Sequence, residues 1–324
     1  MPCPTLARTA VAALALLACS AQAQTVLKIG YTPAKDSHYW VGATAFCAEV
    51  EKNTQNRFRC QQFPSSALGG EREQIEAVQL GTQDAVITST GPVGNFVPEV
   101  KIVDIPFLFR DYAHARTVFD GPIGQDLLTK FPPKGLVALA WTENGFRHIT
   151  NSRRPIHKPE DTRGLKVRTM ENKVHMEGYR SFGMLPTPMA FPEVFTALQQ
   201  GTVDGQENPI PVITSSKFAQ VQKHLSLTGH VYSPALLLLS NAVWSKLSDA
   251  DRKVFLEAAK VSVAAQRRKV DEDDANGVAL LEKEGMQVVR NVDKTAFQEA
   301  LKPAYAAYAR EFGADNIKKI QDVR

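Results

Sequence analysis

One amide side chain stands directly before a proline in the segment ALQQGTVDGQENP, which runs from Ala197 to Pro209. Proline pushes the residue before it out of the helical region and into extended backbone. Asn208 is therefore expected to present its amide from the end of a strand or from a loop. The chemistry that this residue type offers is hydrogen bonding, since an amide both donates and accepts.

The helix before this amide is predicted from hydrophobic spacing. Four apolar residues recur at i, i+3, i+4 and i+7 and therefore share one helical face: Phe191, Val194, Phe195 and Leu198. Gly201 follows the last turn, where a residue with left-handed backbone commonly ends a helix. The sequence thus predicts a helix that stops at a glycine and a strand that carries Asn208.

The same pattern occurs twice in the chain. AVQLGTQDA, from Ala77 to Ala85, matches ALQQGTVDG, from Ala197 to Gly205, as A-(V/L)-Q-x-G-T-x-D-(A/G). Helix, glycine and strand in this order are common, so coincidence is one explanation. The other explanation is a pair of similar α/β lobes whose strands end at a shared cleft, where open α/β sheets bind ligands.

Sequence motifs for catalysis and metal binding are absent. The chain has no G-x-S-x-G elbow, no G-x-x-x-x-G-K-(S/T) phosphate loop, no H-E-x-x-H and no C-x-x-C. Its seven histidines are scattered without a recurrent metal-binding spacing. We therefore expect no cofactor, no metal ion and no enzymatic activity.

The N-terminus is predicted to direct export. Arg8 precedes the apolar run TAVAALALLA and a small-residue stretch, which is the layout of a secretory signal cleaved after Ala23. The apolar run is too short to span a bilayer. Acylation at Cys19, as in a lipoprotein, is the alternative. We expect a signal peptide over residues 1–23 and a mature protein in the periplasm.

Charge and cysteine content narrow the possible partners of the mature chain. Loss of Arg8 with the signal lowers the formal charge from +4 to +3, and the charges are dispersed, so nucleic acid is not expected as a partner. Cys47 and Cys60 are the cysteines that remain. In an oxidising compartment they are expected to form a disulfide that contributes about 3 kcal/mol. Two free buried thiols are the alternative.

Strands and helices are predicted to alternate along the chain. The expected elements of a first run are a strand at 26–32, a helix at 38–54, a strand at 57–63, a helix at 71–80 and a strand at 84–89. A second run is expected to begin at RHITNS, and one long helix is expected from Ser248 to Gly285. Such alternation predicts a parallel sheet. The absence of a Gly/Ser linker predicts short crossings between the lobes.

Several longer stretches carry a resemblance to a known family. They are GFRHITNSRRPI from Gly145, GLKVR from Gly164, PTPMAF from Pro186 and EVFTALQQGTVDGQENP from Glu193, with FPSSALGGERE near the start. Through them the mature chain resembles the extracytoplasmic solute receptors of tripartite ATP-independent periplasmic (TRAP) transporters, the DctP family. The resemblance implies a two-lobed α/β periplasmic binding protein that closes around a small organic acid and delivers it to two membrane subunits.

The resemblance also implies how the chain divides. Lobe I is expected to hold residues 24–144 plus about 230–270, and lobe II residues 145–229 plus about 271–324. The long helix is expected to span both lobes. The protein is expected to be a monomer that docks on the small and large membrane subunits of its transporter.

Three residues match the family's ligand-binding positions most closely. Arg168, at the end of the strand GLKVR, matches the arginine that binds the ligand carboxylate. Its planar guanidinium can make two parallel hydrogen bonds to a carboxylate and keeps its charge; a surface ion pair is the alternative role. Arg147 matches a second arginine that supports the carboxylate, and Asn208 matches an amide that hydrogen-bonds the ligand.

Other matches are less uniform. Phe191 matches a position whose ring packs on the ligand, although the amphipathic helix alone would also bury it. Glu71 matches an acidic position that can accept hydrogen bonds from ligand hydroxyls. Ser89 stands where some members carry a second acid, so their substrates do not transfer to this chain. Four weaker candidates flank the first strand and the end of the Arg168 strand: His38, Glu171, Asn172 and His175.

These residues favour a binding receptor. Two arginines predict at least one carboxylate on the ligand, and Glu71, Asn172 and Asn208 predict hydroxyls. A sugar acid such as a uronate or aldonate is therefore the expected ligand. C4-dicarboxylates, keto acids and aromatic acids are alternatives within the family. A periplasmic sensor and a periplasmic enzyme on the same scaffold are the alternatives of other classes.

Overall fold

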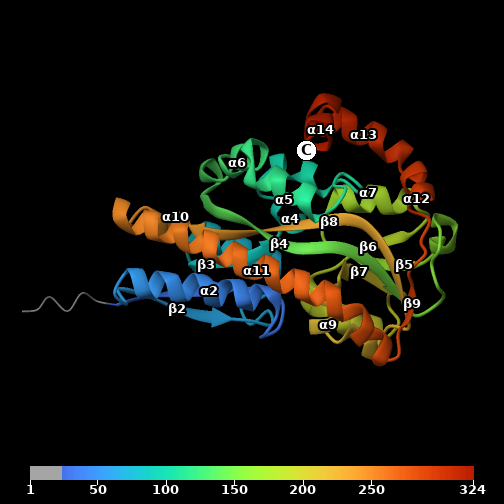
Figure 1. Cartoon of the computed structure of the whole chain (residues 1–324), viewed down its shortest axis with the longest axis horizontal. Coiled ribbons are helices and arrows are strands. Elements are labelled where there is room, and N and C mark those ends of the chain that lie inside the picture. The colour runs from blue at the N-terminus through green and yellow to red at the C-terminus, as the bar shows by residue number, and fades with distance from the viewer. Residues whose placement is uncertain (1–23) are drawn as a thin grey trace, which may run out of the picture.

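The computed structural model describes residues 24–324, and the expected signal peptide lies outside the described residues. Within them, nine strands form one sheet. Helices lie on both sides of its two long strands, which cross the middle of Figure 1. No helix in residues 24–324 is both long and apolar enough to cross a membrane.

The elements follow one another in this order. The strands are β1 Thr25–Gly30, β2 Phe58–Phe63, β3 Ala85–Ser89, β4 Leu136–Asn151, β5 Lys166–Thr169, β6 Leu185–Pro188, β7 Gly205–Pro209, β8 His224–Ser240 and β9 Gln287–Val289. The α-helices are α2 His38–Asn53, α3 Glu71–Leu80, α4 Thr90–Val93, α5 Tyr112–Asp120, α6 Pro122–Leu128, α7 Lys173–Ser181, α8 Val194–Gln199, α9 Ile210–Ser215, α10 Asn241–Trp244, α11 Asp249–Lys283, α12 Lys294–Ala300, α13 Lys302–Phe312 and α14 Ala314–Gln321. Short 3₁₀ helices include η1 Pro98–Asp104 and η4 Phe191–Glu193.

The sheet consists of two similar units joined by two long strands. Its order is β2-β1-β3-β8-β4-β7-β5-β6, with β9 beside β8. We call β1 to β3 (residues 25–89) the first unit and β5 to β7 (residues 166–209) the second unit. Strands pair in parallel within each unit, whereas β3–β8, β8–β4 and β4–β7 are antiparallel. The prediction of a parallel sheet therefore holds inside each unit and is wrong where the units join.

The predicted break before RHITNS is also wrong. β4 runs without interruption from Leu136 to Asn151 and pairs with β8 along most of its length. Its register shifts between Glu143 and Gly145, and Gly145 has a φ of +116°. Only glycine adopts such backbone at little cost, so the strand bends here without ending.

The repeated sequence motif occupies equivalent places in the two units. Gly81 and Gly201 both have left-handed backbone after α3 and α8. The carboxylate of Asp84 accepts the backbone N–H of Lys28 at 2.7 Å, and that of Asp204 accepts the N–H of Lys166 at 2.9 Å. Each aspartate therefore ties the strand after its helix to the neighbouring parallel strand.

Helix α11 connects the two units on one side of the sheet. Its 35 residues begin at the N-cap Ser248, whose side chain accepts the N–H of Asp251. The helix packs on α2 and on α9, and Figure 1 shows it running diagonally between them. Gln266 in its middle donates to the carbonyl of Glu143 at 2.6 Å. The predicted long helix thus spans both units and contacts β4 where that strand bends.

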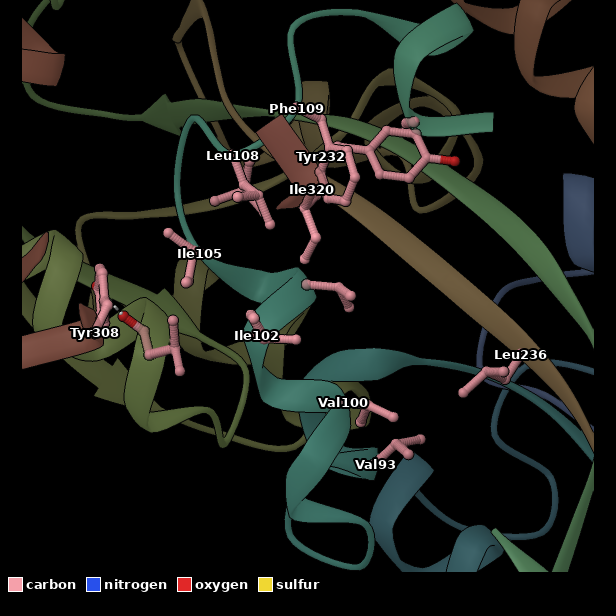
Figure 2. Close-up of a cluster of buried hydrophobic side chains, with 14 of the residues drawn as sticks. Val93, Val100, Ile102, Ile105, Leu108, Phe109, Tyr232, Leu236, Tyr308 and Ile320 are labelled. Atoms are coloured by element: carbon pink, nitrogen blue, oxygen red, sulfur yellow. Dashed lines mark hydrogen bonds between the residues drawn. The ribbon is translucent and has the colours of Figure 1, made fainter. Parts of the chain in front are cut away.

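Three apolar clusters hold these layers together. One packs α2 against β1, β3 and α11 in the first unit, and one packs α8 and α9 in the second. The largest lies under α4, η1 and the C-terminal helices and includes residues of both units. Figure 2 shows part of it, with the labelled side chains Val93, Val100, Ile102, Ile105, Leu108, Phe109, Tyr232, Leu236, Tyr308 and Ile320.

The structure places the two cysteines of the mature chain side by side. Cys47 in α2 and Cys60 in β2 have Cα atoms 5.6 Å apart and are joined as a disulfide. This separation is normal for such a bond. The disulfide connects α2 to β2, the edge strand of the first unit. Neither cysteine lines the pocket described next.

Candidate functional site

The strand ends of the two units enclose one pocket. Its lining comes from both units, from β4 and from α9: Thr32, Pro33, Tyr39, Glu71, Ser89, Asn144, Arg168, Met170, Phe191, Asn208 and Val212. Parallel strands of an open α/β sheet bind ligands at their carboxyl ends, and Ser89 and Asn208 lie at the ends of β3 and β7. Most of these side chains are buried. The pocket is therefore nearly closed to solvent.

Arg168 is a buried cation without a carboxylate partner. Its side chain is 2% exposed, and its Nε and Nη2 donate to the carbonyl of Met189 at 3.0 and 2.8 Å. Its Nη1 has no hydrogen-bond partner, and no carboxylate of residues 24–324 lies within salt-bridge distance of it. Burial lowers the pKa of Arg168 to about 10, so the group is still charged at neutral pH. A buried charge of this kind requires an anion.

Arg147, by contrast, already has its anion. Its guanidinium forms an ion pair with Glu207, and both side chains are fully buried. It also donates to the carbonyl of Glu207 at 2.6 Å and to the side-chain oxygen of Asn208 at 3.1 Å. Arg147 does not line the pocket. The structure thus places it behind Asn208, where it orients that amide.

A polar network surrounds this ion pair. The Tyr179 hydroxyl donates to Glu207 at 2.9 Å, and His230 lies 3.6 Å from the same carboxylate. Burial by itself would raise the pKa of Glu207, but the charge and hydrogen bonds of Arg147, together with nearby His230, hold that pKa far below its usual range. Glu207 is therefore ionised, and its negative charge compensates Arg147.

Asn208 lies on extended backbone, as its place before Pro209 predicts. It belongs to β7 and pairs with His148 of β4. Its side-chain nitrogen donates to Gln206 at 2.5 Å, while its oxygen accepts from Arg147. Because an amide nitrogen carries two hydrogens, Asn208 retains one donor for the pocket that it lines.

Glu71 brings an acceptor to the pocket from the other unit. It is the first residue of α3, and its Oε1 accepts from the Thr88 hydroxyl at 3.0 Å and from the N–H and hydroxyl of Ser89 at 2.7 Å each. These bonds all fall on Oε1. Oε2 remains able to accept from a ligand. Ser89 therefore acts mainly by holding Glu71.

Phe191 combines the two roles expected for it. Its ring lies in the pocket lining, with its centre 5.8 Å from the guanidinium carbon of Arg168. The same ring contacts the apolar cluster of the second unit and lies 6.3 Å from the ring of Phe218. A half-buried aromatic face next to a cation can pack on the carbon chain of a bound acid.

The four weaker candidates lie outside the lining of this pocket. Asn172 caps α7 and donates to Asp104 at 2.7 Å. His175 is fully buried beside Tyr179. His38 bonds Asn144 at 2.8 Å and so lies one residue behind the lining. Glu171 lies at an adjoining opening that Arg168 and Phe191 share.

Several lining residues were not predicted from the sequence. Thr32 and Pro33 lie within three residues of the end of β1, and Met170 follows β5 directly. The rule that ligands gather at strand ends could therefore have found them. Tyr39 is adjacent to the candidate His38. Asn144 had no such signal, because its segment looked like a break between two strands and is the bend of β4.

The described residues contain no cluster of three or more histidine, cysteine, aspartate or glutamate side chains that could hold a metal ion. What the pocket offers is a buried cation, a carboxylate acceptor and neutral hydrogen-bonding groups. None of its lining residues is a cysteine or a histidine. The arrangement is suited to holding a small polar anion.

A two-lobed α/β fold with an anion pocket between its units defines a solute-binding protein. Residues 29–311 match the family model described as bacterial extracellular solute-binding protein, family 7 (DctP). The chain belongs to this family, whose members serve TRAP transporters. A relative named solute-binding protein from Verminephrobacter eiseniae is 56% identical, over 94% of this chain and 91% of that protein.

Solved structures of similar proteins contain bound acids. A TRAP periplasmic solute-binding protein from Polaromonas sp. JS666, bound to D-erythronate, is 72% identical with a TM-score of 0.92, covering 93% of this chain and 99% of that one. One from Bordetella bronchiseptica, with bound density interpreted as pantoate, is 54% identical with a TM-score of 0.91, covering 93% and 100%.

Proposed function

We propose that this chain is the receptor of a TRAP transporter for a hydroxylated sugar acid, with a short aldonate as the best candidate. The observation that carries the proposal is the guanidinium of Arg168, which is buried, charged and without a counter-ion among the described residues. A ligand carboxylate would supply that counter-ion and accept from Nη1. Such a bond would compensate the desolvation of the arginine.

The second polar group of the pocket supports hydroxyls on the ligand. Glu71 presents a carboxylate oxygen, which accepts hydrogen bonds and repels a second carboxylate. A polyhydroxy monocarboxylate satisfies both Arg168 and Glu71, whereas a C4-dicarboxylate would place its second charge near Glu71. The similar structure with D-erythronate contains an acid of this class.

Closure of the two units around the acid is the proposed mechanism. Arg168, Phe191 and Asn208 come from the second unit, while Glu71 and Ser89 come from the first. A ligand that contacts both sets is bound best when the units are closed, so binding shifts the population toward the closed form. Contacts between the units support this: the Ser89 hydroxyl lies 3.2 Å from the sulfur of Met170, and Arg72 lies 3.6 Å from Glu171.

Membership of the family supports the remaining parts of the proposal. The receptor would be exported through residues 1–23, remain a monomer in the periplasm and deliver the acid to the small and large membrane subunits. We propose lobe boundaries near residue 144 and, on the return, near 230 and 270. Binding and release require no covalent chemistry, so an enzymatic role is not proposed.

A thermal-shift screen of the purified mature protein tests the function. The panel contains aldonates, uronates, C4-dicarboxylates, keto acids and aromatic acids. A ligand that binds only the folded state stabilises it in proportion to ln(1 + [L]/Kd), so aldonates or uronates should raise the midpoint by several degrees. A shift with dicarboxylates or aromatic acids alone would contradict the proposal. Mass spectrometry of the unfolded protein controls for acid retained through purification.

A further inference from the structure

The hydroxyl of Tyr39 has no hydrogen-bond partner in the described part of the chain, although the residue is only 1% exposed. Tyr39 is the second residue of α2, and it lines the pocket. A buried hydroxyl without a partner costs free energy comparable to a lost hydrogen bond. A ligand in the pocket would remove that cost.

Tyr39 differs in this respect from every other tyrosine. The chain has seven tyrosines, all within residues 24–324. The other six donate their hydroxyls to protein acceptors: Tyr31 to Gln62, Tyr112 to Asp274, Tyr179 to Glu207, Tyr232 to Glu143, Tyr305 to Pro106 and Tyr308 to Val174. The exception is the one tyrosine that lines the pocket.

Two neighbouring side chains, His38 and Asn144, support the part of the pocket lining that contains Tyr39. Its ring meets the ring of His38 edge-on, with centres 4.7 Å apart. Burial lowers the pKa of His38 to about 4, so this ring is neutral at pH 7. Its Nε2 lies 2.8 Å from the side-chain oxygen of Asn144. With that oxygen engaged, the Asn144 nitrogen remains for the pocket.

The charges around the pocket indicate which ligand group Tyr39 binds. Arg168 is the only basic residue of the lining, so the carboxylate of an acid belongs there. Burial raises the pKa of Tyr39 well above its usual value, and the nearby carboxylate of Glu71 raises it further. Tyr39 is therefore a neutral donor in a lining that also contains the acceptor Glu71.

We infer that Tyr39 is a specificity-determining residue, which donates to a hydroxyl of the ligand while that hydroxyl donates to Glu71. The inference rests on the proposed function. Unlike a keto oxygen or a methyl group, a hydroxyl can accept from a donor and donate to an acceptor at once. A keto oxygen would place its lone pairs against the Glu71 carboxylate, and a methyl group would leave both protein groups unpaired. The pocket thus selects hydroxy acids over keto and deoxy acids of the same length.

The test is a thermodynamic cycle that combines one substitution in the protein with the removal of one hydroxyl from the ligand. Kd is measured by calorimetry for D-erythronate and its three monodeoxy analogues, 2,3-, 2,4- and 3,4-dihydroxybutanoate. Each acid is titrated into the wild-type protein and into Tyr39→Phe. We expect Tyr39→Phe to weaken D-erythronate binding about 5- to 30-fold. For the analogue that lacks the hydroxyl bound by Tyr39, the same substitution should change Kd less than 2-fold.

Tyr31→Phe is the matched control. Tyr31 is also buried in the first unit, but its hydroxyl already donates to Gln62 at 2.8 Å and lies outside the pocket. This substitution should lower the melting temperature of the ligand-free protein and leave Kd unchanged. Tyr39→Phe should leave the melting temperature of the ligand-free protein unchanged or raise it, because no bond is lost.

The outcomes separate this inference from the function on which it rests. If the wild-type protein binds D-erythronate and Tyr39→Phe binds it equally well, the inference is wrong and the proposed function stands. Equal losses for all four acids would also overturn it, because Tyr39 would then act on the shape of the pocket alone. If the wild-type protein binds no hydroxy acid in the screen, the proposed function itself fails.

Discussion

The two units share one backbone plan and differ in what they bury. In the first unit Gly30 of β1 pairs with Val86 of β3, and in the second Arg168 of β5 pairs with Gln206 of β7, so the two pairs are equivalent. The repeated motif then aligns Ile87 with Glu207. The first unit has an apolar residue at this place, and the second has a carboxylate. One scaffold can therefore carry an apolar core or a charged network, provided that the charges are paired.

The same correspondence assigns complementary chemistry to the pocket. Glu71 and Phe191 stand six residues before the alanines that begin the two copies of the motif, and both line the pocket. At this position the first unit thus contributes the acceptor Glu71, and the second contributes the ring of Phe191. At the position of Gly30 in the first unit, the second unit has Arg168. A cation and an acceptor facing each other suit a ligand with an acid end and a hydroxylated end.

Glu207→Gln should produce the largest effect on stability. The change leaves the buried Arg147 without its counter-charge, which costs on the order of 3–5 kcal/mol in the free energy of unfolding. Ile87→Val, at the equivalent place in the first unit, should cost about 0.5–1.5 kcal/mol. Urea unfolding measures both. Equal losses in the free energy of unfolding would show that the buried ion pair of the second unit is no more important for stability than the apolar residue of the first.

Arg168→Met should affect binding more than stability. Loss of the guanidinium that holds a desolvated carboxylate should weaken binding by on the order of 2–5 kcal/mol. The free energy of unfolding without ligand should change by no more than about 1 kcal/mol, because burial already disfavours this charge. Arg168→Lys keeps the charge and should give an intermediate Kd in calorimetry. Wild-type affinity in Arg168→Met would remove this residue from the site.

His175→Phe should change the acid sensitivity of the second unit. Burial lowers the pKa of His175 to about 3, and neither ring nitrogen has a partner in the described chain. An unfolded histidine has a pKa of about 6.5. The stability from neutral His175 is therefore complete above about pH 6.5 and is lost as pH falls toward 3, at about 1.4 kcal/mol per pH unit.

Thermal unfolding at pH 7 and pH 5 measures this difference. The variant should lose about 2 kcal/mol less than the wild-type protein between these two pH values. Identical losses would mean that His175 is already protonated, or is partnered, in the folded protein.

The sequence predicted those elements that are determined by residues close to one another in the chain. The helix at 71–80 was predicted with its observed bounds, because its apolar spacing and Gly81 act within a few residues. The strand that carries Asn208 was predicted because Pro209 restricts its backbone. These are local effects, and they placed the repeated motif correctly.

Features that depend on distant residues were not predictable in this way. β4 looked like two strands because its bend at Gly145 resembles a turn, and only its pairing with β8 shows continuity. Asn172 looked like a ligand-binding amide, but it is engaged as the cap of α7. The sequence alone could not show that Arg147 is neutralised by Glu207, whereas Arg168 is not.

A crystal structure of the mature protein with D-erythronate would test the central claim most directly. We expect the carboxylate within hydrogen-bond distance of Arg168 Nη1 and a hydroxyl of the same molecule against Oε2 of Glu71. One acid would then use the cation of the second unit and the acceptor of the first. An acid bound with its carboxylate away from Arg168, or held by one unit alone, would contradict the proposed binding between the units.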